Sequence, residues 1–269
     1  MAERGSREMA HTGRLRVLPL QRIAARSNDR SDDEARGAML SVIPNPPRAT
    51  LPILGSSDLF PVRRIYCVGR NYRAHAREMG ADERDPPFFF LKPADTVQIV
   101  PEGVTVEHPY PPRTENYHFE VELVAALGRG GRDIPVETAG PHVYGYAVGL
   151  DMTRRDVQDE AKRLARPWDL AKSADASAPV GPLHPASAIG HPTRGAITLA
   201  VDAAERQRGD LSEMIWSLPE QIALLSTYFE LHPGDLIFTG TPSGVGAVKR
   251  GETMHAAIDG LGAIHLQVV

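Results

Sequence analysis

Two glutamates, Glu120 and Glu122, are the residues of this chain whose type and spacing first point to chemistry. They belong to the segment 117–123, in which polar and apolar side chains alternate strictly. Side chains two positions apart in a β-strand share a face, so His118 is predicted to point the same way as both glutamates. An apolar run at 123–127 follows directly, so this strand is predicted to lie beside a core.

Two carboxylates held side by side near a core repel each other. At about 4–5 Å and an effective dielectric constant near 20, the repulsion is roughly 3–4 kcal/mol. A divalent cation removes it, and oxygen ligands suit Mg²⁺, Mn²⁺ or Ca²⁺. Asp151 is the natural third ligand because it follows the segment 144–150, where a strand is expected to end at a cleft. Spacing alone leaves an alternative open, in which an edge strand pairs its glutamates with Lys or Arg.

The elements that must position these carboxylates are mostly strands. Helices are predicted at 156–164 and 218–229, the second of which is opened by Pro219 near its first turn. Many strands with few helices predict a β-rich α+β fold rather than a doubly wound sheet. Alternating or apolar runs predict strands at 63–68, 119–127, 144–150 and 235–238, a hairpin from 197–201 and 205–208, and short strands within 254–269.

The N-terminal part of the chain differs from the rest. Residues 1–38 hold eight Arg and no Lys, with little periodic hydrophobicity. They lack the apolar core of a secretory signal and are richer in acidic residues than a transit peptide. Residues 1–50 are therefore predicted to be a largely disordered extension, followed by a catalytic domain at 51–269. Met39 begins the more protein-like stretch and is an alternative start of translation.

Composition limits the kinds of partner. A net charge of −4 in 269 residues gives no general affinity for nucleic acid, and an acidic substrate would need local positive charge. The single cysteine, Cys67, excludes an intrachain disulfide and a Cys-based zinc site, and an inert core thiol is favoured over a nucleophile. No apolar run approaches the roughly 18 residues of a membrane span. We therefore expect a cytoplasmic protein with no nucleic-acid or membrane partner.

A further set of short motifs occurs in order from about residue 63 to the C-terminus. They are Cys67–Tyr72, Phe90–Pro93, Glu120–Leu123, Gly149–Thr153, Pro167–Trp168, Lys172–Ser173 and the run 239–246. In this order they resemble the motifs of the fumarylacetoacetate hydrolase family. The resemblance implies a mixed β-sheet roll with a mobile lid, and a homodimer with one site per subunit.

The resemblance also implies a role for each matching residue. It makes Glu120, Glu122 and Asp151 the ligands of Mg²⁺ or Mn²⁺, with Ca²⁺ as a further hard cation. His75 and Glu78 match a pair that activates water, and their separation of three would place them on one face of a helical turn.

The implied substrate contacts lie further along the chain. Arg155, Gln158, Lys172 and Thr241 match residues that hold the pyruvoyl end of the substrate. Beside a metal and a developing enolate, Lys172 would offer a fixed positive charge.

The implied reaction is hydrolysis of the carbon–carbon bond of an acylpyruvate. Fumarylpyruvate, cleaved to fumarate and pyruvate in the gentisate pathway of aromatic breakdown, is the first expectation. Its second carboxylate needs a cation, for which the chain offers Arg70, Arg73, Arg77 or Lys92. The segment 70–82 is expected to order as a lid over bound substrate. The alternatives are a decarboxylase of oxaloacetate or another 2-oxo diacid, and a non-catalytic protein that binds small acids.

Overall fold

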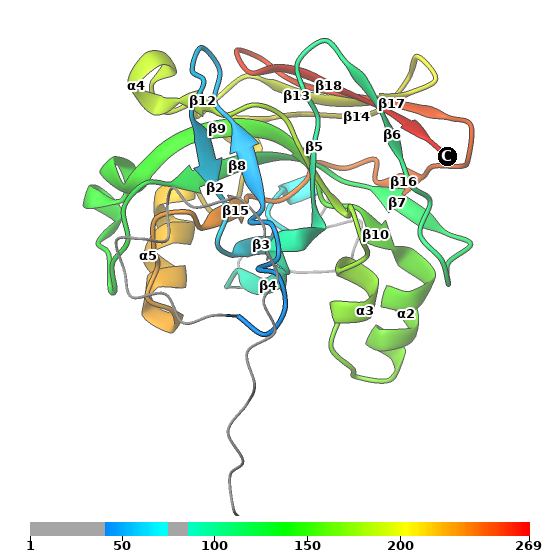
Figure 1. The fold of residues 1–269 in the computed structure, drawn as a ribbon, viewed down its shortest axis with the longest axis horizontal. Helices are drawn as coiled ribbons and strands as arrows, with labels where there is room; N and C mark the ends of the chain where they lie inside the picture. The colour runs from blue at the N-terminus through cyan, green and yellow to red at the C-terminus, as the bar shows by residue number, and fades with distance from the viewer. Residues whose placement is uncertain (1–40, 75–85) are drawn as a thin grey trace, which may run out of the picture. The chain divides into compact units, whose positions relative to one another are not determined.

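The computed structural model describes residues 41–74 and 86–269. Residues Pro47–Val269 fold as one unit that is built mainly of β-strands (Figure 1). Residues Met1–Pro46 form a separate unit, of which only 41–46 are described. The predicted disorder of the N-terminal extension therefore lies mostly outside the described residues and stays a prediction, as does the predicted lid at 70–82.

A mixed eight-stranded sheet forms the centre of the unit, in the order β4-β3-β15-β8-β9-β11-β5, with β12 beside β9. The pairs β3–β15 and β5–β11 are parallel, and the remaining pairs are antiparallel. Its strands are β3 (Ile65–Gly69), β4 (Phe88–Lys92), β5 (Val97–Ile99), β8 (Val121–Leu127), β9 (Val143–Leu150), β11 (Ala178–Val180), β12 (His184–Pro185) and β15 (Leu236–Phe238).

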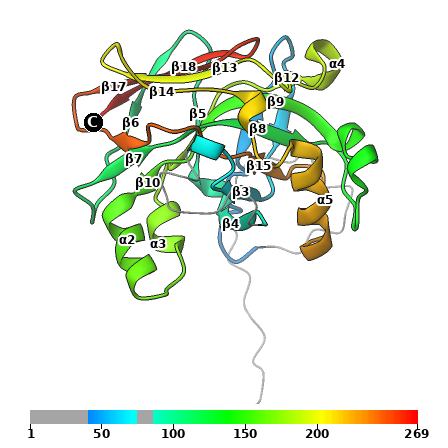
Figure 2. The same ribbon diagram turned by 180° about the vertical axis from the view of Figure 1, so that it is seen from behind.

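A five-stranded sheet, in the order β14-β13-β17-β18-β6, covers one face of the central sheet (Figures 1 and 2). Alternate residues of β13 are buried, and Leu199 packs in one apolar cluster with Leu123 of β8 and Ile264 of β18. This alternation is what a sheet with one face on a core requires. The strands are β6 (Thr105–His108), β13 (Ala196–Val201), β14 (Ala204–Asp210), β17 (Thr253–Ile258) and β18 (Gly262–Val268).

The opposite face of the central sheet packs against the ribbon of β1 (Thr50–Pro52) and β2 (Leu59–Pro61). Phe60 of β2 belongs to the same apolar cluster as Cys67, Val124 and Phe238. Cys67 is fully buried, and burial raises the pKa of its thiol well above the usual value. The structure therefore supports the prediction of an inert core thiol.

A short three-stranded sheet, β10-β7-β16, corrects one prediction. The expected strand at 119–127 is wrong at its start, because the chain leaves β7 and enters β8 of the central sheet at Glu120. Side chains continue to alternate through this change of sheet, so the sequence pattern does not reveal it. The strands are β7 (Tyr117–Phe119), β10 (Thr153–Arg154) and β16 (Gly246–Ala247).

Helices are short and lie at the margins. The helices α2 and α3 lie on one side of β3 and β4, and α5 lies on the other (Figures 1 and 2). The predicted helix at 218–229 is confirmed as α5, which a capping box between Ser217 and Glu220 opens. No helix in residues 41–74 or 86–269 is long and apolar enough to cross a membrane. The helices are α2 (Arg155–Arg163), α3 (Asp169–Lys172), α4 (Ala186–Ile189) and α5 (Leu218–Tyr228), with single 3₁₀ turns η1 (Ala94–Thr96), η2 (Val136–Thr138), η3 (Gly140–His142) and η4 (Leu211–Glu213).

The β-rich α+β class is thus confirmed. The antiparallel pairing of β8 with β9 sets up the site, because it places Glu122 opposite Gly149. The N–H of Asp151 then donates to the carbonyl of Glu120 at 2.9 Å, which extends the ladder by one step. The residue before β8 and the residue after β9 therefore meet at one edge of the sheet.

Candidate active site

Three carboxylates meet at this edge, as the sequence predicts. Glu120, Glu122 and Asp151 each offer an oxygen atom, and these atoms all lie within 4.8 Å of one another. The three residues are only 5%, 2% and 1% exposed. Water therefore cannot screen their mutual repulsion, and cations must do so.

Lys172, at the end of α3, supplies one such cation. Its Nζ lies 2.8 Å from Glu120 Oε2 and 2.6 Å from Asp151 Oδ2. Burial opposes the charged ammonium, but the two carboxylates outweigh burial and raise the pKa of Lys172. Lys172 is therefore a fixed positive charge at neutral pH, bridging two of the three carboxylates.

Glu122 is held differently from its neighbours. Its Oε2 accepts a hydrogen bond of 2.8 Å from the backbone N–H of Gly240, and no Lys or Arg of the described segments forms a salt bridge with it. Burial, followed by the charges of Asp151 and Glu120, raises the pKa of Glu122 well above its usual value. Glu122 is thus the carboxylate of the cluster whose charge no ion pair of the described segments offsets. An all-oxygen donor set of this kind fits a hard divalent cation.

The guanidinium of Arg155, at the start of α2, organises the next layer. Its Nη2 forms an ion pair with Glu120 Oε1, its Nη1 donates to Gln158 Oε1 at 2.5 Å, and its Nε donates to His118 Nδ1 at 3.2 Å. Burial and the charge of Arg155 lower the pKa of His118 to about 4, so His118 is neutral and can accept this bond. Because its oxygen faces Arg155, Gln158 keeps its amide N–H groups for a ligand.

The turn after β15 brings Thr241 to the wall of the same pocket. Its hydroxyl donates to the carbonyl of Val121 at 2.8 Å and accepts from Gln207 Nε2 at 2.8 Å. The hydroxyl proton of Thr241 is therefore committed within the protein, and this side chain fixes the turn to β8. Gly240 is required here because its φ is +100° and an added Cβ would lie 2.6 Å from Asn71 Cβ.

Arg70 lies at the outer end of the pocket with aromatic side chains around it. Its guanidinium carbon is 5.6 Å from the ring centre of Phe88, which makes an edge contact of 5.3 Å with Trp168. The Nε of Arg70 is buried and has no hydrogen-bond partner among the described residues. The turn that carries it is fixed by Asn71, whose side chain donates to the carbonyl of Thr239 at 2.7 Å.

The other cations predicted for the second carboxylate of the substrate do not line this pocket among the described residues. Lys92 is fully buried and lies 2.9 Å from Asp151 Oδ1, so it faces the carboxylate cluster and not the outer pocket. Arg73 is exposed, and Arg77 lies outside the described residues. His75 and Glu78, the predicted water-activating pair, also lie outside them, and their role stays a prediction.

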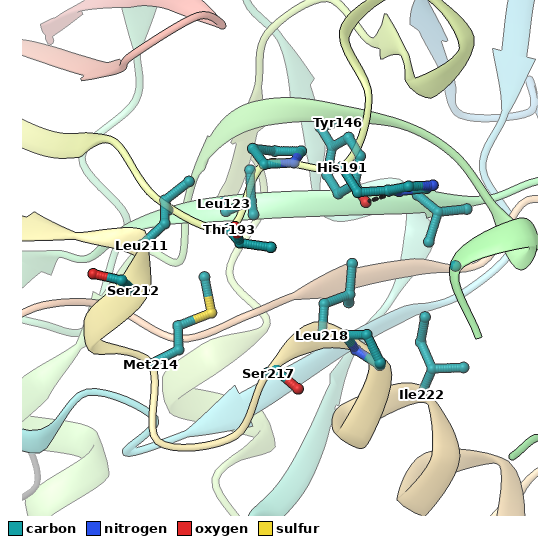
Figure 3. Close-up of a pocket in the computed structure, with 14 residues that line it drawn as sticks. Leu123, Tyr146, His191, Thr193, Leu211, Ser212, Met214, Ser217, Leu218 and Ile222 are labelled. Atoms are coloured by element: carbon teal, nitrogen blue, oxygen red, sulfur yellow. Dashed lines mark hydrogen bonds between the residues drawn. The ribbon is translucent and has the colours of Figure 1, made fainter. Parts of the chain in front are cut away.

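A second cavity, of about 260 Å³, is apolar and has no carboxylate in its lining (Figure 3). Leu123, Met214 and Leu218 point into it from different elements, and Tyr146 and His191 form a hydrogen bond of 2.7 Å at its edge. Leu123 and the neighbouring Glu122 point to opposite faces of β8, so this cavity is separate from the carboxylate cluster. The polar pocket is therefore the one equipped for chemistry.

Comparison with known proteins agrees with this geometry. Residues 64–269 match the family model of the fumarylacetoacetate hydrolase C-terminal domain. The crystal structure of fumarylpyruvate hydrolase from Pseudomonas aeruginosa, in complex with Mn²⁺ and pyruvate, is 59% identical with a TM-score of 0.84, and covers 86% of this chain and 99% of its own.

Two curated relatives carry different names. The mitochondrial oxaloacetate tautomerase of Rattus norvegicus is 45% identical over 206 residues, which is 77% of this chain and 91% of the relative. Fumarylpyruvate hydrolase of a Ralstonia species is 44% identical over 181 residues, which is 67% of this chain and 92% of the relative.

Proposed function

The chain belongs to the fumarylacetoacetate hydrolase family, and we propose that it is a divalent-metal-dependent hydrolase that cleaves fumarylpyruvate to fumarate and pyruvate. The observation that carries this proposal is the buried cluster of Glu120, Glu122 and Asp151 beside Lys172. The 59% identity to a fumarylpyruvate hydrolase whose structure contains Mn²⁺ and pyruvate supports it, because pyruvate is a product of this reaction.

We assign the three carboxylates as ligands of Mg²⁺ or Mn²⁺, with Ca²⁺ as a further cation of suitable chemistry. A bound ion of this kind would act as a Lewis acid on the 2-oxo acid end of the substrate and hold it in one orientation. The raised pKa of Glu122 supports the assignment, because a nearby divalent charge would favour the ionised carboxylate.

The pyruvoyl end of the substrate is assigned to the residues around Arg155. Two of the five guanidinium N–H groups of Arg155 are left after its bonds to His118, Gln158 and Glu120, and Gln158 presents its amide N–H groups. These donors suit one carboxylate. Lys172 would stabilise negative charge as the enolate of pyruvate leaves.

Hydrolysis also needs a base for water. We assign this role to His75, oriented by Glu78, as the family resemblance implies. His75 would take a proton from water as the water oxygen attacks the acyl carbonyl carbon, and that proton would return to the departing enolate carbon. The bond between the acyl carbon and that carbon breaks, which leaves one carboxylic acid and pyruvate.

The acyl end is assigned to Arg70 with Phe88 and Trp168. The buried Nε of Arg70 without a partner, next to aromatic rings, suits a flat diacid whose far carboxylate accepts hydrogen bonds. Of the cations that the sequence offers for this carboxylate, Lys92 is fully buried, whereas Arg70 lines the pocket beside Phe88 and Trp168.

The same resemblance supports proposals about the oligomeric state, the compartment and the pathway of the protein. We expect a homodimer in the cytoplasm that acts in the gentisate pathway of aromatic breakdown. Gel filtration with light scattering tests the first expectation, and growth of a deletion strain on gentisate tests the last.

The second proposed function is action on oxaloacetate, by decarboxylation or tautomerisation. It is favoured by the 45% identity to an oxaloacetate tautomerase, and oxaloacetate has the same 2-oxo acid end. The discriminating experiment loads the metal-free protein with Mn²⁺ and measures kcat/KM for fumarylpyruvate, acetylpyruvate and oxaloacetate. We expect fumarylpyruvate to be the best substrate. A much higher kcat/KM for oxaloacetate would refute the hydrolase proposal.

A further inference from the structure

One buried lysine has no place in the chemistry proposed so far. Lys92, at the end of β4, is 1% exposed and its Nζ is surrounded by protein oxygens. It lies 2.9 Å from Asp151 Oδ1 and donates to the carbonyl of Met152 and to Ser177 Oγ, both at 3.1 Å, and to the carbonyl of Lys172. The three hydrogen bonds use all three ammonium donors, so none is left for a substrate, and Asp151 Oδ1 is held by the ion pair alone, without a hydrogen bond from the described residues.

The two carboxylate oxygens of Asp151 face different lysines. Lys92 holds Oδ1, whereas Oδ2 faces the Nζ of Lys172 at 2.6 Å. Glu120 has the same arrangement, with Arg155 on Oε1 and Lys172 on Oε2. In each carboxylate, one oxygen therefore faces Lys172 and the other faces a second cation.

We propose that Lys92 is a positioning residue of the metal site, whose positive charge beside Oδ1 fixes the orientation of the Asp151 carboxylate in the cluster. This inference rests on the metal site of the proposed function. The contact with the carbonyl of Lys172 adds a second effect, because the same ammonium anchors the end of α3. Partners that orient a metal ligand typically contribute 10–100-fold to metal affinity.

The test is Mn²⁺ affinity, measured on the full chain by calorimetry and by the electron paramagnetic resonance signal of free Mn²⁺. Lys92→Gln removes the charge but keeps a donor for the surrounding carbonyls, which limits its effect on folding. We expect its Kd for Mn²⁺ to rise about 10–100-fold. Lys249→Gln, the same change at an exposed lysine, and Ser177→Ala, which removes an acceptor of Lys92 without touching Asp151, should both stay within about threefold of the wild type.

A second readout separates positioning from general damage. If Lys92 acts through Asp151, activity of Lys92→Gln should be low at limiting Mn²⁺ and should recover in excess Mn²⁺. A folded Lys92→Gln protein with the wild-type Kd would overturn the inference. If this variant does not fold, Lys92→Arg takes its place, because a guanidinium keeps the charge but cannot occupy the ammonium position. A wild-type Kd in Lys92→Arg would then overturn it, whereas a wild-type chain that binds no Mn²⁺ would refute the proposed metal site itself.

Discussion

The change Glu122→Gln distinguishes a metal site from a buried ion-pair cluster, because the two predict opposite effects on stability. The oxygens of Glu122, Glu120 and Asp151 lie within 4.8 Å of one another. At that separation and an effective dielectric constant near 20, each repulsion is roughly 3.5 kcal/mol. Lys172 offsets part of it, and burial together with the remaining repulsion raises the pKa of Glu122. The amide can still accept the hydrogen bond from Gly240.

In the metal-free protein the variant should therefore be more stable than the wild type. Glu122 has a pKa that is raised on folding, so the wild type loses stability as pH rises from the unfolded value of 4.5 towards the folded pKa. Glutamine does not titrate, so the advantage of the variant should grow with pH across that window. We expect about 1–2 kcal/mol at its upper end, which corresponds to roughly 2–8 °C in Tm.

Mn²⁺ should reverse the order of the two proteins. At 100 times its Kd, a ligand stabilises the wild type by about 2.7 kcal/mol. If the variant binds at least 100-fold more weakly, the same concentration stabilises it by at most about 0.4 kcal/mol. Thermal unfolding with EDTA and with Mn²⁺ measures both effects, and Glu102→Gln is the control because it makes the same change at an exposed glutamate. A variant that is less stable without metal, beside a wild type that Mn²⁺ does not stabilise, would refute the reasoning.

Three further changes test other parts of the site. Arg70→Met should lower kcat/KM for fumarylpyruvate by roughly 30-fold or more and leave acetylpyruvate, which has no second carboxylate, nearly unchanged. Equal losses for both substrates would contradict the assignment. His75→Ala should lower kcat by about 10²–10⁴-fold with unchanged Mn²⁺ affinity in calorimetry, and a loss of metal binding would place His75 elsewhere. Gly240→Ala should lower the free energy of unfolding by about 2–4 kcal/mol in urea, because the new Cβ meets Asn71. Gly251→Ala, with a similar positive φ and open space, should lose only about 1 kcal/mol.

The sequence predicts the carboxylate cluster well because it depends on local pattern. Alternation places Glu120 and Glu122 on one face, and the next long strand along the chain pairs with β8 and ends one residue before Asp151. These relations need only the two-residue period of a strand and the antiparallel pairing of neighbours.

Lys92 and the committed hydroxyl of Thr241 could not be predicted in the same way. Lys92 ends an apolar run between prolines, and in sequence it looks like a cation available to substrate. Its burial depends on segments distant in sequence, because Met152, Lys172 and Ser177 supply the oxygens around its ammonium. Thr241 donates to Val121 through contacts that join distant segments. Partners of this kind come from tertiary packing, and the residues near them in sequence carry no sign of it.

Substrate choice must be decided outside the carboxylate cluster. Glu120, Glu122, Asp151 and Lys172 together suit any 2-oxo acid whose reaction passes through an enolate, including oxaloacetate as well as fumarylpyruvate. The similar identities of 45% and 44% to relatives with these two substrates in their names agree with a shared centre. The two acids differ in the length of the chain beyond the 2-oxo group, which directs attention to Arg70 at the outer end of the pocket. Replacing Arg70 should therefore alter the ratio of kcat/KM for fumarylpyruvate to kcat/KM for oxaloacetate. Mn²⁺ affinity should stay constant, because Arg70 is not one of the metal ligands.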